Sequence, residues 1–162
     1  MANNELVYVT YIRTTPERLW DAISKPEFTE RYWFGRRVEC GGQPRGVMNW
    51  YANDILADSG EIIEFDPPRR LVFTMRVEFD AGLRAEGHTR VTFEIEPVGS
   101  EVRLCVTHTG FQSDSRVREG CARGWSMILS SLKSLLETDR PMEITGSAAA
   151  KAEEQRATGA VR

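Results

Sequence analysis

The sequence predicts an α+β domain in which a curved antiparallel β-sheet wraps around one long C-terminal α-helix. Two observations point to this fold. A helical period runs from Ser115 to Thr138, and short alternating segments separated by turn residues run from Gly35 to Thr109 without a helical pattern between them. Strands joined by such short links form an antiparallel sheet, which needs a cover on one face. The long helix is the largest apolar surface available to cover it.

The chain begins with one strand and two short helices. Residues 5–14 (ELVYVTYIRT) alternate and are rich in β-branched and aromatic side chains, so they predict a strand with Tyr8 on one face. Thr15 followed by Pro16 is typical of a helix start, and this helix must end before Pro26. A second short helix is expected from residue 26 to about residue 33.

The alternation in the next region predicts which side chains share a face of each strand. Asp58, Ser59 and Gly60 are interpreted as a turn and residues 80–87 as a loose loop. Side chains that share a face within one strand are Met48, Trp50 and Ala52; Leu71, Phe73, Met75 and Val77; Val91, Phe93 and Ile95; and Val102, Leu104, Val106 and His108.

The two halves of the long helix differ in side-chain size. Its second half carries Ile and Leu on the buried face, whereas Gly120 and Gly124 flank Cys121 in the first half. An interior glycine costs about 1 kcal/mol relative to alanine, so the pair requires a reason. One explanation is a cavity beside Trp125; the other is close approach of a strand or loop to the helix.

The composition narrows the class of protein. The chain has 162 residues, 41% hydrophobic content and a net charge of −3, which favour one globular domain and argue against nucleic acid as a partner. We expect this domain at residues 5–141 and a flexible tail at 142–162. No apolar run reaches the roughly 20 residues of a membrane span, and no signal peptide is apparent, so a cytoplasmic location is expected. The three cysteines show no metal-ligand spacing, and neither metal nor cofactor is predicted.

Aromatic residues from different elements are the strongest indication of a site. Either they form ordinary core packing or they line a pocket for an apolar or aromatic ligand. No catalytic motif is present, and no catalytic residue is assigned. His108 is either a satisfied buried histidine or a proton donor or acceptor in the pocket. The residues predicted to line the pocket are Tyr8, Trp33, Trp50, Phe73, Met75, His108, Gly124 and Trp125.

Four segments in order resemble a known family. They are VYVTYIRTTPERLWDAISKPEFTERYWFG, GEIIEFDPPRRLVFT, TRVTFEIEPVGSEVRLCVTHTGF and GWSMILSSLKSLLET. Over residues 5–141 the chain is similar to bacterial proteins related to the C-terminal domain of the activator of Hsp90 ATPase, in the START-like superfamily. The resemblance implies a helix-grip fold with a ligand-sized cavity between sheet and helix. Family members often have Trp where this chain has Met75, which implies a cavity of different shape.

Three functions follow as hypotheses. The first is binding of a small hydrophobic or aromatic molecule in the predicted pocket. The second is an enzyme of the cyclase or hydrolase type, with His108 or a carboxylate as general acid or base. The third is a chaperone-linked module that binds a protein partner. Neither the ligand nor the oligomeric state follows from the sequence.

Overall fold

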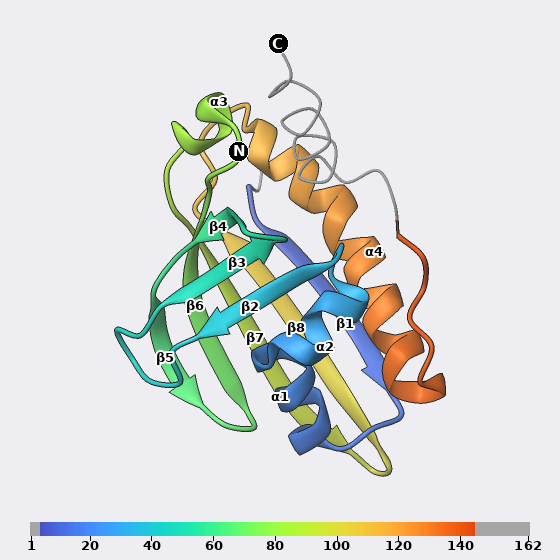
Figure 1. Ribbon diagram of the computed structural model, residues 1–162. Coiled ribbons are helices and arrows are strands. Elements are labelled where there is room, and N and C mark those ends of the chain that lie inside the picture. Colours follow the sequence, from blue (N-terminus) through green and yellow to red (C-terminus); the bar gives the residue numbers. More distant parts are fainter. Residues whose placement is uncertain (1–3, 145–162) are drawn as a thin grey trace.

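The computed structural model of the chain describes residues 4–144. In this part, a strongly curved antiparallel sheet of eight strands holds a long C-terminal helix against one of its edges and its inner face (Figure 1). The strands follow the order β1-β8-β7-β6-β4-β3-β2, and β5 pairs with β6 beside this path. The predicted fold class is therefore confirmed.

The bounds of the elements are as follows. The strands are β1 (Leu6–Ile12), β2 (Arg36–Cys40), β3 (Met48–Ala52), β4 (Ile55–Ser59), β5 (Ile62–Asp66), β6 (Arg70–Val77), β7 (Thr89–Val98) and β8 (Glu101–Thr109). The helices are α1 (Pro16–Ser24), α2 (Pro26–Tyr32), α3 (Ala81–Arg84) and α4 (Arg116–Thr138).

Strand β8 illustrates how alternation fixes the inner face of the sheet. Its side chains at every second position from Val102 to His108 are completely buried. In the paired strand β1, Val7 and Tyr11 are on the opposite face, and each is about half exposed (54% and 51%). The inner face of the sheet thus forms the core, as the alternation predicts.

Helix α4 is capped at its start and hydrogen-bonded to the sheet near its end. At its start, the Ser115 hydroxyl accepts a hydrogen bond from the Arg118 amide at 2.9 Å. Near its end, the Lys133 ammonium donates to the Tyr11 carbonyl at 2.6 Å, which satisfies a backbone acceptor on the outer edge of β1. The Leu and Ile side chains of its second half are buried in the core.

Helices α1 and α2 close the space between β2 and α4 (Figure 1). Thr15 caps α1, as predicted, by accepting a hydrogen bond from the Arg18 amide at 3.2 Å. The buried Thr29 hydroxyl of α2 accepts a hydrogen bond from the amide of Val38 in β2 at 3.1 Å. Because α2 contacts both β2 and α4, the turn that follows it lies beside the first half of α4.

Two local predictions are wrong. Asp58 and Ser59 belong to β4 rather than to a turn, because their pairing with Val77 and Arg76 of β6 outweighs the turn preference of the Asp-Ser-Gly sequence. The predicted loop at 80–87 contains the one-turn helix α3.

The chain after α4 runs back along that helix. The Met142 amide donates to the hydroxyl of Ser131, a buried residue of α4, at 3.1 Å. Of the predicted tail at 142–162, residues 145–162 lie outside the described part. None of the helices described is long and apolar enough to cross a membrane.

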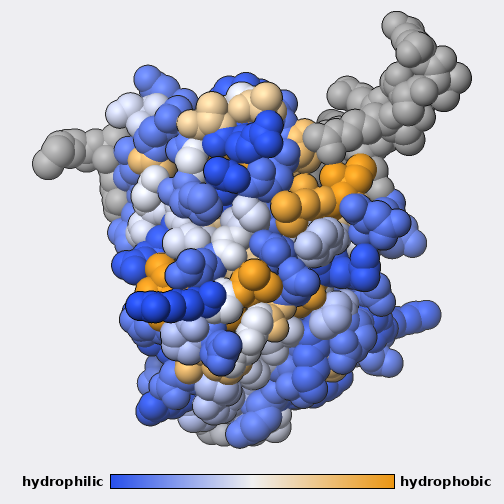
Figure 2. Space-filling view, turned by 60° about the vertical axis from the view of Figure 1, so that its left-hand side comes forward, coloured by the Kyte–Doolittle hydropathy of each residue, from blue (hydrophilic) through white to orange (hydrophobic). Residues whose placement is uncertain are grey.

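The face of the molecule seen in Figure 2 is mainly hydrophilic, with small separated hydrophobic patches. Isolated patches of this size are normal on a folded domain. On this face, therefore, no apolar patch indicates a binding surface.

Candidate functional site

Five aromatic side chains from five elements form one buried cluster, which we call the aromatic cluster. Its members are Trp33 after α2, Trp50 on β3, Phe73 on β6, Phe93 on β7 and Trp125 on α4. Each is at most 3% exposed. Four of them are among the eight residues predicted to line the pocket, so half of the predicted residues meet in this cluster.

The rings of the aromatic cluster contact one another in a closed circuit. Trp33 and Trp50 are stacked with ring centroids 4.0 Å apart, and Trp125 meets Trp33 edge-on at 5.2 Å. Phe93 joins Trp125 at 5.8 Å and Phe73 at 5.7 Å, and Phe73 is 6.4 Å from Trp50. Contacts of this kind add about 0.5–1.5 kcal/mol per pair beyond the burial of area. The cluster is therefore well packed.

A hydrogen-bonded chain holds Trp125 in place. The Trp125 indole nitrogen donates to His108 Nδ1 at 3.0 Å, so the ring proton of neutral His108 is on Nε2. This Nε2 is 2.7 Å from the Thr89 hydroxyl, which donates its own proton to the Met75 carbonyl at 3.1 Å. Both nitrogens of His108 are thus engaged, and burial lowers its pKa from 6.5 to about 3. These bonds make His108 a positioning residue for Trp125 and argue against its role as an acid or base.

Tyr8 and Gly124 lie around the aromatic cluster. The Tyr8 hydroxyl donates to the Ala122 carbonyl of α4 at 2.8 Å and so joins β1 to the glycine-bearing half of the helix. A Cβ added to Gly124 would meet only the Phe34 ring, at 3.9 Å. At Gly120 it would meet nothing within 4 Å. Close backbone approach therefore explains neither glycine; Gly120 is exposed to solvent, and only the half-buried Gly124 faces another side chain.

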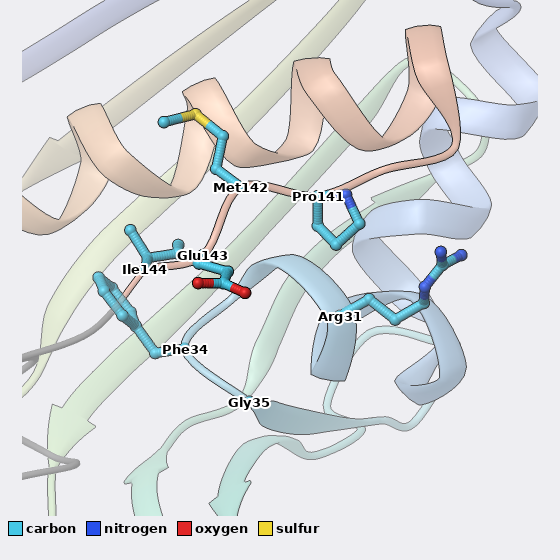
Figure 3. A pocket seen from close by; sticks show the side chains of 7 residues that line it. All are labelled: Arg31, Phe34, Gly35, Pro141, Met142, Glu143 and Ile144. Atoms are coloured by element: carbon cyan, nitrogen blue, oxygen red, sulfur yellow. The ribbon is translucent and has the colours of Figure 1, made fainter.

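Phe34 covers Gly124, and no pattern in the sequence singles it out. It adopts a left-handed backbone conformation with φ 50°, followed by Gly35 with φ 71°. This conformation is costly for a bulky side chain. On its other side Phe34 lies toward Ile144 in a surface pocket of about 300 Å³ (Figure 3). Phe34 therefore separates this surface pocket from α4.

A buried ion pair lies beside Trp50. Arg36 Nη1 on β2 is 2.5 Å from Asp58 Oδ2 on β4, and both side chains are nearly inaccessible (12% and 3%). Asp58 is the register partner of Trp50, so the two side chains leave the sheet on the same face. Burial raises the pKa of the Asp58 carboxyl, and the charge of Arg36 opposes that rise.

The glycine-bearing half of α4 lies near this ion pair. Burial raises the pKa of the Cys121 thiol to about 12, with a further contribution from the negative charge of Asp58. Such a thiol remains protonated and is a poor nucleophile at neutral pH. Among residues 4–144, no group of three or more His, Cys, Asp or Glu side chains is arranged to hold a metal ion.

Sequence reasoning missed Arg36, Asp58 and Thr89 at this site. The alternation of Arg36 with buried Val38 would have placed Arg36 on the inner face, had β2 been assigned. Asp58 gave no such indication, because its turn-like sequence concealed a buried strand position. Thr89 was hidden by its position at the start of β7, next to the predicted loop.

Comparisons with known proteins agree with this architecture. The family model described as "Activator of Hsp90 ATPase homolog 1-like protein" matches residues 13–137. A search of curated proteins gives no match.

Similar solved structures come from bacteria and from a protozoan parasite. Protein MLL2253 from Mesorhizobium loti is 23% identical, with a TM-score of 0.70 over 82% of this chain and 96% of that one. The Aha1 dimer from Colwellia psychrerythraea is 16% identical, with a TM-score of 0.68 over 83% and 96%. PFC0360w, an HSP90 activator from Plasmodium falciparum, is 19% identical, with a TM-score of 0.68 over 82% and 95%. At these identities the likeness concerns the fold alone.

Proposed function

The chain belongs to the family of activator of Hsp90 ATPase homolog 1-like proteins, and on this basis we propose that it binds a small hydrophobic or aromatic molecule between the sheet and α4. The proposal depends on one observation. The aromatic cluster lies against the half of α4 that carries Gly120 and Gly124, where only Phe34 comes within 4 Å of a Cβ added at Gly124. Aromatic walls beside unfilled helix surface are typical of sites for apolar ligands.

The ligand enters, in this proposal, by displacing Phe34 from Gly124. Phe34 is half-buried, in contrast to the five rings of the aromatic cluster. Its left-handed backbone conformation costs on the order of 1–3 kcal/mol, and a displacement that relaxes this conformation regains part of that energy. Displacement exposes the edge of Trp125 and Trp33, which then contact the ligand. Tyr8, Met75 and His108 act around this contact by fixing the surrounding elements.

A substitution of Gly124 by leucine tests this proposal. The leucine side chain would fill the space beside Trp125, and the change adds about 1 kcal/mol of helix propensity. We expect Gly124→Leu to fold with equal or higher stability and to lose ligand binding. Ser126→Leu is the matched control, because Ser126 is exposed on the same helix and receives the same side chain, with a smaller gain in helix propensity.

Thermal unfolding with a library of lipids and aromatic metabolites provides the measurement. A ligand at about one hundred times its Kd stabilises a protein by about 2.7 kcal/mol. For a chain of 162 residues this corresponds to a rise in Tm of roughly 5–10 °C. The rise should persist in Ser126→Leu and disappear in Gly124→Leu. Equal responses of the two variants to every active compound would contradict the proposal.

A protein-binding function is the second candidate, supported by an exposed apolar strip on β1. Val7, Val9 and Tyr11 are 54%, 45% and 51% exposed on the outer face of this edge strand. A Val9→Glu variant should bind an Hsp90 chaperone more weakly than the natural protein in a titration with purified components. If the natural protein neither binds the chaperone nor alters its ATPase rate, this candidate fails.

The enzyme hypothesis has less support. The nitrogens of His108 are both hydrogen-bonded, and the carboxylate of Asp58 is paired with Arg36. Neither group is poised to exchange a proton with a ligand.

A further inference from the structure

Two buried hydrogen-bond donors on the inner face of the sheet have no partner. Among residues 4–144, the buried side-chain nitrogens without a hydrogen bond include Trp50 Nε1 and Arg36 Nε. Such atoms are rare in folded proteins, and each destabilises the fold unless a ligand or water accepts its hydrogen bond. Because Trp50 is only 1% exposed, its indole N–H is separated from bulk solvent.

The two donors are on neighbouring strands and leave the same face of the sheet. Val38 is the register partner of Trp50 and Arg36 that of Ala52, so Arg36 and Trp50 are diagonal neighbours. Diagonal residues on one face are roughly 7–8 Å apart at the backbone, and the Trp and Arg side chains are long enough for their donors to converge on one acceptor. Trp50 also stacks on Trp33, so the same molecule would meet both polar and aromatic surface.

Both atoms are donors, which restricts the ligand to one that offers an acceptor. An indole N–H accepts no hydrogen bond, and neither does a guanidinium. The Asp58 carboxylate, the nearby acceptor, already receives a hydrogen bond from Arg36 Nη1, so the two groups that remain without any partner are both donors. The polar end of the ligand must therefore present an oxygen or nitrogen lone pair.

The charge of the surroundings restricts the ligand further. Arg36 is already neutralised by Asp58 in a site that excludes water. Arg76 is likewise paired with Glu78, at 2.7 Å, so this pair adds no net positive charge. An anionic head group would leave one uncompensated negative charge in the interior, which is strongly unfavourable. An uncharged acceptor avoids this cost.

We infer that the ligand is an uncharged molecule with an aromatic or apolar body and a carbonyl oxygen, which accepts hydrogen bonds from Trp50 Nε1 and Arg36 Nε. This inference rests on the proposed function and adds the chemical class of the ligand. The aromatic body lies against Trp33 and Trp125, and the carbonyl is directed toward the end of the cluster beside Asp58. Ketones, esters and amides of apolar compounds fit this description.

Three probes of nearly equal size test the inference. Acetylnaphthalene carries the carbonyl, isopropenylnaphthalene replaces its oxygen by a methylene group, and naphthoate replaces the ketone by a carboxylate. Affinities are measured from quenching of tryptophan fluorescence in the full chain. We expect acetylnaphthalene to bind about tenfold more tightly than either of the other two, because only it satisfies the buried donors without adding charge.

Two tryptophan variants test whether Trp50 is responsible for the preference for the ketone. Trp50→Phe removes the unpartnered N–H, and we expect the ratio of ketone to hydrocarbon affinity to fall from about ten to about one. Trp33→Phe is the matched control, since it shortens the other ring of the stacked pair and should keep the ratio. A ratio is used because a general loss of packing weakens both probes equally. If Trp50→Phe fails to fold, the ratio of ketone to hydrocarbon affinity in the natural protein still tests the inference.

The outcomes separate this inference from the proposed function. Equal binding of the ketone and the hydrocarbon by the natural protein overturns the carbonyl inference and leaves a hydrophobic site. A preference for naphthoate also overturns it. Absence of binding by all three probes overturns both the inference and the assignment of a ligand to the aromatic cluster.

Discussion

The pH dependence of stability tests the buried chain that joins Trp125, His108 and Thr89. Burial lowers the pKa of His108 from 6.5 to about 3. Between these two values the unfolded chain binds a proton that the folded protein does not bind. The contribution of His108 to the free energy of unfolding is therefore highest above about pH 6.5 and falls as the pH is lowered toward 3.

The size of this loss follows from the shift in pKa. Each pH unit between the two pKa values corresponds to about 1.4 kcal/mol. Integrated from about pH 7.5 to about pH 5, the contribution of His108 is roughly 2 kcal/mol. His108→Gln keeps a donor and an acceptor but does not titrate in this range. Urea unfolding of both proteins at several pH values measures the difference, with each protein compared with its own stability at the highest pH.

The comparison of the natural protein with His108→Gln removes the contribution of the other titrating groups to the change in stability. The pKa of Asp58 is raised by burial against the opposing charge of Arg36, so its contribution to stability decreases as the pH rises through the acid range. This contribution has the opposite sign to that of His108 and is present in both proteins. If the natural protein and His108→Gln lose the same free energy between about pH 7.5 and about pH 5, the assignment of a buried neutral histidine is refuted.

Three further substitutions test how α4 and the sheet are positioned, each by urea unfolding at neutral pH. Tyr8→Phe removes the 2.8 Å hydrogen bond to the Ala122 carbonyl and should lower stability by about 1 kcal/mol; no change would show that this bond does not hold β1 to α4. Gly60→Ala places a Cβ 1.6 Å from the Thr74 carbonyl oxygen, so a loss of at least about 3 kcal/mol is expected, and a small loss would contradict the sheet geometry. Glu86→Gln removes the negative charge that accepts amide hydrogen bonds at the start of α4, which should cost about 0.5–1 kcal/mol and less at high salt.

The fold was predictable because the two clearest periodic patterns in the sequence mark the side chains that pack in its core. The helical period of residues 115–138 corresponds to α4 within one residue at its start. The two-residue period from Val102 to His108 corresponds to completely buried positions of β8. The same alternation placed Trp50 and Phe73 on the inner face, and the helical period placed Trp125 on the buried face of α4, so these three predicted pocket residues meet in the aromatic cluster.

The polar part of the site was not predictable because it depends on how strands pair. Asp58 and Arg36 meet only because β4 and β2 both flank β3, which no local period indicates. Asp58 also has the composition of a turn, and its burial follows from its pairing with Val77 in β6. The hydrogen bond between His108 and Thr89 likewise requires the register of β7 and β8. Sequence patterns give the face of a side chain, whereas the identity of its neighbour requires the register.

The contrast between the two halves of α4 connects stability with the proposed binding. The second half buries Leu132, Leu135 and Leu136 almost completely, each at most 2% exposed, so it anchors the helix to the sheet. The first half gives up such contact area at the half-buried Gly124, and the capping of α4 and the Tyr8 hydroxyl help to hold it in position. A ligand that occupies this half replaces contacts that the chain itself does not make. Binding should therefore stabilise the first half of α4 more than the second, which amide hydrogen exchange can measure turn by turn.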